Sequence, residues 1–144
     1  MFDPPKKQYK RILAVLLAAA ALAVLAACEP VSNDISFKNE LKVPVNIYFS
    51  RADDDSWSDK PTAVNVVSGA ETGIAFSRLD SASGKRFDVG AIDENGMNYD
   101  IYDVVLIEGD LITLSGDESE AHFTITHSDG TSTVLSAHIR KNGD

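Results

Sequence analysis

Residues 35–140 are predicted to fold as an all-β domain, a small antiparallel β-sandwich of two sheets with about eight strands. Apolar residues recur with period two from Ile35 onward, and no window shows the apolar stripe of a helix. Turn sequences such as Asp93-Glu94-Asn95-Gly96 and Ser128-Asp129-Gly130 separate the short apolar runs. A chain of 144 residues has room for one core, so these strands indicate one sandwich, with a small closed barrel as the alternative.

The first two strands show the clearest alternation of apolar and polar residues, as half-buried antiparallel strands require. Their apolar positions are Ile35, Phe37, Leu41, Val43, Val45, Ile47 and Phe49. By the same pattern, further strands are predicted over residues 63–67, 72–76, 86–92, 99–107, 111–114, 121–127 and 131–139.

The last two predicted strands form a hairpin. Asp129-Gly130 suits a two-residue type I′ turn, whose twist matches that of the flanking strands. With that turn, Ile125 lies opposite Val134 and Thr124 lies opposite Leu135. The more apolar face of the hairpin is expected to face the core.

The first 27 residues have the organisation of an export signal. A basic segment with Lys6, Lys7, Lys10 and Arg11 is followed by an apolar run rich in alanine. At about 16 residues this run is shorter than a membrane-spanning helix needs, and small residues follow it in place of a charged stop-transfer segment. A cleaved signal peptide is therefore favoured over a transmembrane anchor.

The end of this apolar run, Leu25-Ala26-Ala27-Cys28, resembles the lipobox of bacterial lipoprotein precursors at all of its positions. The resemblance implies transfer of a diacylglyceryl group to the Cys28 thiol, cleavage between Ala27 and Cys28, and acylation of the new amino group by a fatty acid such as palmitate. Two or three acyl chains anchor a protein stably, whereas one does not. The predicted membrane contact is therefore the lipid on Cys28.

The domain organisation follows from this site. Residues 1–27 are the signal peptide, 28–34 the lipidated cysteine with a short tether, 35–140 the sandwich and 141–144 a polar tail. In proteobacterial sorting an Asp directly after the lipidated Cys favours the inner membrane, and this chain has Glu29. We therefore expect a cell-envelope protein on the periplasmic face of the outer membrane.

The predicted mature part is strongly acidic. Residues 28–144 contain 9 Lys and Arg against 21 Asp and Glu, which is a net charge of −12. Such a surface is repelled by phosphate backbones and by anionic lipid heads, so a nucleic-acid partner is not expected. Cys28 is the only cysteine, which excludes an internal disulfide.

Two kinds of binding site are open. Trp57, with Tyr48 nearby in the sequence, is a candidate partner-binding residue, although a lone Trp more often covers the end of a core. Acidic loops could hold Ca²⁺ through the oxygens of Asp53, Asp54, Asp55 and Asp93, with Asp59, Glu94 and Asn95 beside them. The 93–96 segment is equally a plain hairpin turn.

Catalytic signals are weak. The chain has no nucleophile-elbow, zinc-protease or phosphate-loop motif, and its only thiol is the predicted lipid site. The hairpin register separates His122, His127 and His138, so a histidine zinc site is not expected. A hydrolase of the cell envelope is the remaining enzymatic alternative.

One looser likeness concerns the whole sandwich. The order Tyr48-Phe49-Ser50, Trp57, Gly69, Phe87-Asp88-Val89, 93–96 and Tyr99 resembles small β-sandwich modules of bacterial exported proteins. Such sandwiches have many functions, so this likeness implies a fold and no activity. The leading hypothesis is a non-enzymatic, lipid-anchored binding module whose partner is a protein or an envelope component, and calcium binding is the alternative.

Overall fold

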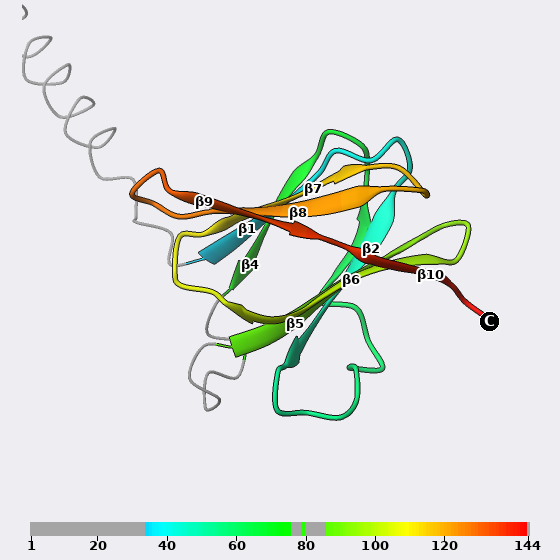
Figure 1. Ribbon diagram of the computed structural model, residues 1–144, viewed down its shortest axis with the longest axis horizontal. Coiled ribbons are helices and arrows are strands. Elements are labelled where there is room, and N and C mark those ends of the chain that lie inside the picture. Colours follow the sequence, from blue (N-terminus) through cyan, green and yellow to red (C-terminus); the bar gives the residue numbers. More distant parts are fainter. Residues whose placement is uncertain (1–33, 76–78, 80–85, 144) are drawn as a thin grey trace, which may run out of the picture. The chain divides into compact units, whose positions relative to one another are not determined.

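Two five-stranded β-sheets form the part of the chain that the computed structural model describes, residues 34–75, 79 and 86–143 (Figure 1). The predicted all-β sandwich is confirmed. The strands are β1 (Asp34–Asn39), β2 (Val45–Arg51), β3 (Ala63–Val66), β4 (Glu71–Ala75), β5 (Arg86–Asp93), β6 (Met97–Val105), β7 (Leu111–Gly116), β8 (Ala121–Thr126), β9 (Ser132–Ser136) and β10 (His138–Lys141).

The two sheets are here named sheet A and sheet B. Sheet A has the strand order β4-β1-β7-β8-β9, and sheet B has the order β10-β6-β5-β2-β3. Neighbouring strands run antiparallel except β1 and β7, which are parallel. In Figure 1 sheet A is the upper layer and sheet B crosses beneath it.

Alternation along each strand builds the core. In β2 the residues Val45, Ile47 and Phe49 are buried, whereas those between them are half-buried on the other face. Sheet A contributes fully buried side chains such as Phe37 and Phe123. Because every second side chain points to the same face, the period of two in the sequence translates directly into one apolar face per sheet.

The predicted register of the last hairpin is wrong by one residue. Phe123 pairs with Leu135, Thr124 with Val134 and Ile125 with Thr133. The loop has three residues because the N–H of His127 bonds to the carbonyl of Thr131 at 2.8 Å, and Gly130 within the loop adopts a φ of 85°. A glycine in this left-handed conformation closes a three-residue hairpin loop, which moves the partner strand by one position.

The predicted strand over residues 131–139 is divided in two. β9 ends at Ser136 in sheet A, and β10 begins at His138 in sheet B. Ala137 lies between them, and its N–H still bonds to the carbonyl of Ala121 in sheet A at 2.9 Å. The chain therefore crosses from one sheet to the other at Ala137, a change that the alternation pattern does not reveal.

The predicted signal peptide, the cleavage site at Ala27, the lipidated Cys28 and nearly all of the tether lie outside the described residues. These predictions stay predictions. Within the described ranges, no helix is long and apolar enough to span a membrane.

Candidate functional site

Polar and aromatic side chains gather on the outer face of sheet B. Its strands are paired so that His138, Asp100, Gly90 and Tyr48 lie side by side across β10, β6, β5 and β2. The next outward row along the strands is Arg140, Asn98, Ile92 and Asn46. Residues nearly a hundred positions apart in the chain thus share one small surface.

Figure 1 shows the loop between β2 and β3, residues 52–62. This loop brings Trp57 to the outer face of sheet B, beside Gly90. A Cβ atom built on Gly90 would lie 3.2 and 3.3 Å from two carbons of the Trp57 ring, so the edge of the indole rests on the glycine backbone. The ring of Tyr102 is 6.3 Å away and tilted by 56°. Trp57 therefore packs on the outside of sheet B.

Beside the indole lies a cleft of about 260 Å³, here named the Trp57 cleft. Trp57, Tyr48 and Ile92 supply its aromatic and apolar lining, and Asn98, Asp100 and Arg140 supply polar groups. Ser58, Asp59 and Gly90 complete it. A concave site with apolar walls and a few convergent polar groups is the usual form of a small-ligand site.

A larger cavity of about 450 Å³ also reaches Trp57, between the 52–62 loop and Phe87. Leu79 forms part of its wall, and the neighbours of Leu79 along the chain lie outside the described residues. The Trp57 cleft, by contrast, is lined wholly by described residues.

Asp100 is the buried charged group of the cleft, with 4% of its surface exposed. Its Oδ2 atom accepts hydrogen bonds from Nε and Nη2 of Arg140, at 3.2 and 2.9 Å, and from the hydroxyl of Tyr102 at 3.2 Å. Burial raises the pKa of Asp100 above its ordinary value, while the charge and hydrogen bonds of Arg140 act against that rise. The pair places a donor group and an acceptor group together at one wall.

Asn98 has an unsatisfied acceptor. The residue is 9% exposed, and its Nδ2 donates to Oδ1 of Asn142 at 2.8 Å. Its own Oδ1 is buried and has no hydrogen-bond partner. Buried side-chain oxygens without a partner are uncommon and cost stability, so this one marks a place where a hydrogen-bond donor is missing.

The four predicted calcium ligands are not brought together. Asp93 pairs with Val45 at one end of the β2–β5 ladder, whereas Asp53, Asp54 and Asp55 follow Arg51 at the other end. Six residues of extended strand separate these ends by about 20 Å. The prediction that the four residues form one calcium site is therefore wrong. Among the described residues, no three Asp, Glu, His or Cys side chains are grouped closely enough to hold a metal ion.

Asp93 serves the hairpin turn instead. Its Oδ1 accepts the N–H groups of Asn95 and Met97 at 2.8 and 2.9 Å, and its Oδ2 accepts the Tyr99 hydroxyl at 3.1 Å. Gly96 follows with a φ of 78°. Burial and the nearby Asp93 charge raise the pKa of Tyr99, because both disfavour a phenolate. The turn interpretation of residues 93–96 is therefore the correct one.

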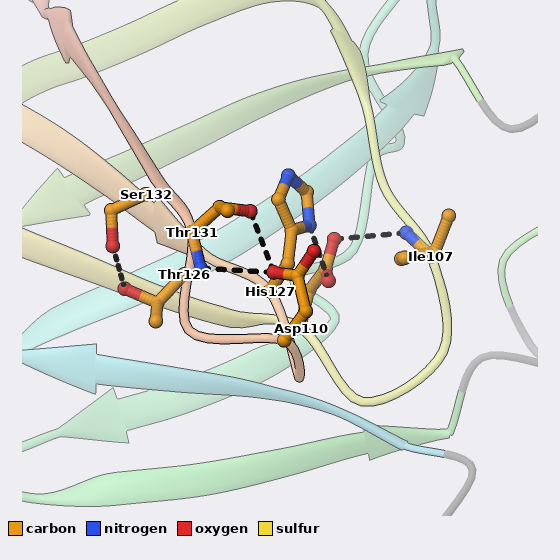
Figure 2. Close-up of polar contacts among 7 residues, drawn as sticks. Ile107, Asp110, Thr126, His127, Thr131 and Ser132 are labelled. Carbon is orange, nitrogen blue, oxygen red and sulfur yellow. Dashed lines mark hydrogen bonds and ion pairs between the residues drawn. The ribbon is translucent and has the colours of Figure 1, made fainter.

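The three histidines lie apart in different surroundings. His138 packs against Tyr102 with ring centres 5.4 Å apart, and His122 lies 3.6 Å from Glu120. Figure 2 shows His127, whose Nδ1 lies 2.7 Å from Oδ1 of the fully buried Asp110. Among the described residues, no hydroxyl is hydrogen-bonded to the other ring nitrogen of His127.

The Asp110–His127 pair has a structural task. Oδ2 of Asp110 accepts the N–H of Ile107 at 2.9 Å (Figure 2), and its backbone carbonyl accepts the N–H of Ser36 at 2.9 Å. Asp110 lies in the segment that leads from β6 in sheet B to β7 in sheet A. Its hydrogen bonds connect this segment to β1 and to His127, which directly follows β8. We interpret this pair as a clamp at one end of the sandwich.

Comparisons with protein families, with curated proteins and with solved structures find no match to this chain.

Sequence reasoning pointed to Trp57 and Tyr48, and the structure places both in one cleft. It missed Asn98, Asp100 and Arg140, because polar residues on outward strand positions look like ordinary solvent-facing residues. One signal was available: Gly90 interrupts the strand 86–93, and a glycine inside a strand often marks a close approach by another group. Here that group is the Trp57 ring.

Proposed function

We propose that this protein is a lipid-anchored lipoprotein of the bacterial envelope whose β-sandwich binds an envelope component in the Trp57 cleft. The anchor rests on the lipobox resemblance of Leu25-Ala26-Ala27-Cys28. The binding role rests mainly on one observation: the only tryptophan of the chain stands on the outer face of sheet B beside a cleft that Tyr48 also lines. Aromatic side chains held at a concave surface are typical binding residues.

The composition of the cleft favours binding over catalysis. Of its two carboxylates, Asp100 is engaged by Arg140 and Tyr102, and Asp59 is exposed. No histidine or cysteine is among the residues that line the cleft, so it lacks the usual base beside a hydroxyl or thiol nucleophile. The proposed activity is therefore recognition without chemical change.

The anchor is tested by expressing the full chain in a bacterium that processes lipoproteins and supplying a tagged palmitate analogue. We expect the mature protein to take up the label and to sediment with membranes, and Cys28→Ser to do neither. Labelling that survives in Cys28→Ser, or its absence from the native chain, would contradict the anchor.

The binding role is tested with the lipidated protein in detergent micelles, used to recover components from solubilised envelope. We expect a defined component to be retained by the native protein and lost with Trp57→Ala. The matched control is Val134→Ala, which changes an exposed residue of sheet A. Equal retention by native protein and Trp57→Ala would remove the cleft from the proposal.

A further inference from the structure

The Trp57 cleft is small. At about 260 Å³ it lies just below the range of about 300 to 1,000 Å³ that holds drug-sized ligands. One ring with its substituents fills such a space, whereas a folded peptide segment does not. The occupant is therefore a single ring or the end of a longer chain of rings.

One side of the cleft suits the C–H face of such a ring. The Trp57 indole stands with its edge on Gly90 and has the open cleft beside it, and Tyr48 and Ile92 extend the apolar lining. Large aromatic rings gain binding energy from contact with an apolar ligand face. Gly90 makes this arrangement possible because a Cβ there would lie 3.2 Å from the indole and 2.8 Å from Oδ1 of Asp100.

The remaining polar groups call for a ligand that both donates and accepts hydrogen bonds. The buried Oδ1 of Asn98 lacks a donor. All three hydrogen bonds that Asp100 receives from Arg140 and Tyr102 end on Oδ2, and Oδ1 lies toward Gly90 at the cleft. The side chain of Arg140 is more than half exposed, and its guanidinium has further N–H donors.

Charge narrows the choice to a neutral ligand. The whole chain has a net charge of −9, which repels anions. A cation could bind to the aromatic rings, but the guanidinium of Arg140 lines the same cleft, repels a second cation and neutralises the buried Asp100 at 2.9 Å. The other carboxylate of the cleft, Asp59, is exposed to solvent, which screens its charge. A neutral ring with several hydroxyl groups on its edge and C–H groups on its face satisfies every one of these conditions.

We infer that the Trp57 cleft binds one neutral saccharide ring, stacked beside Trp57 and donating a hydroxyl hydrogen bond to Oδ1 of Asn98. Arg140 and Asp100 form hydrogen bonds with further hydroxyl groups of the same ring. The inference rests on the proposed binding function and names its ligand class, an envelope glycan of uncharged sugars.

The test uses the lipidated mature protein in micelles, with the indole N–H signal of Trp57 followed by NMR. The probes are glucose, galactose, mannose and N-acetylglucosamine, each added to high millimolar concentration, with choline as the cationic probe and inorganic phosphate as the anionic probe. We expect at least one sugar to shift the Trp57 signal saturably, and choline and phosphate not to do so.

Asn98→Leu separates binding from folding. Leucine keeps the size of the side chain and removes the unsatisfied oxygen together with the hydrogen bond to Asn142. Because Asn142 is exposed and can bond to water instead, the two effects oppose each other and the melting temperature should change little. Sugar affinity should fall by about tenfold, the effect of one lost hydrogen bond of ordinary strength. The control Asn95→Leu changes an exposed asparagine outside the cleft and should leave sugar affinity unchanged.

Three results would overturn the inference: saturation by choline or phosphate with no response to sugars, no response to any probe, or full sugar affinity in Asn98→Leu. The recovery of envelope components with native protein and Trp57→Ala tests the binding function itself, independently of the ligand class. If Trp57 is needed there but no sugar binds, the cleft is a binding site for another ligand class, and only the saccharide assignment fails.

Discussion

Replacing Gly90 with alanine should displace the Trp57 indole from the outer face of sheet B. The new methyl group would lie 2.8 Å from Oδ1 of Asp100 and 3.2 Å from the indole. Asp100 cannot simply rotate away, because Arg140 and Tyr102 hold its other oxygen. The Asp100 carboxylate must therefore shift against its partners, and the Trp57 ring must also move away from the methyl group.

The expected cost follows from two opposing effects. An extra methyl group in a packed site destabilises by about 1 to 3 kcal/mol. Against this, an alanine restricts the unfolded chain and stabilises by about 0.4 to 1 kcal/mol. The free energy of unfolding should thus fall by about 1 to 2 kcal/mol, which lowers the melting temperature by about 4 to 8 °C for a domain of this size.

Tryptophan fluorescence is a direct assay, because Trp57 is the only tryptophan. We expect red-shifted emission in Gly90→Ala together with the loss of stability. Gly73→Ala is the matched control, since its Cβ would meet only Oδ2 of Asp34, at 3.4 Å. That control should keep the native emission and show only the effect of alanine on the unfolded chain, a rise in the free energy of unfolding of about 0.4 to 1 kcal/mol.

A double-mutant cycle with Trp57→Ala isolates the contact. Without the indole, the cost of Gly90→Ala should shrink by about 0.5 kcal/mol or more, leaving the clash with Asp100. Native emission and native stability in Gly90→Ala would refute the packing of Trp57 on Gly90, and equal costs in both backgrounds would refute the coupling.

Two further predictions concern the end of the sandwich shown in Figure 2. His127→Ala leaves the buried Asp110 without its imidazole partner and should lower the free energy of unfolding by about 1.5 to 3 kcal/mol in urea titrations; an unchanged midpoint would show that the clamp contributes nothing. Hydrogen bonds from the Thr131 hydroxyl and N–H lower the pKa of Asp129, so their stabilising effect is present above the ordinary Asp pKa and is lost as pH falls through the folded-state pKa. Thr131→Val should therefore raise the Asp129 pKa in a carboxyl NMR titration, and an unmoved pKa would mean that the hydroxyl bond is absent in solution.

The strands could be predicted because their signal is local. Alternation of apolar and polar residues records which face of a strand is buried, and this holds for β2 and β8 whatever their neighbours are. The 93–96 turn was recognised for the same reason, since an Asp and a Gly at fixed spacing act within a few residues.

The last hairpin shows where local rules end. Asp129-Gly130 is compatible with loops of two or three residues, and the choice shifts every pair of β8 and β9 by one. The division of β9 from β10 at Ala137 is likewise decided by the two sheets between which the chain passes. The alternation of apolar and polar residues along a strand does not indicate which of the two sheets the strand joins.

The sequence by itself determined the all-β class, the approximate strands and Trp57 as a residue of interest, and it predicts the lipid anchor at Cys28. Only the tertiary structure decided what surrounds Trp57. Asp100 and Arg140 are 40 residues apart and form an ion pair because the chain leaves sheet A after β9, so that β10 pairs with β6 in sheet B. Side-chain direction is a local property of a strand, whereas neighbours in a sheet are set by long-range packing, and the Trp57 cleft is made of such neighbours.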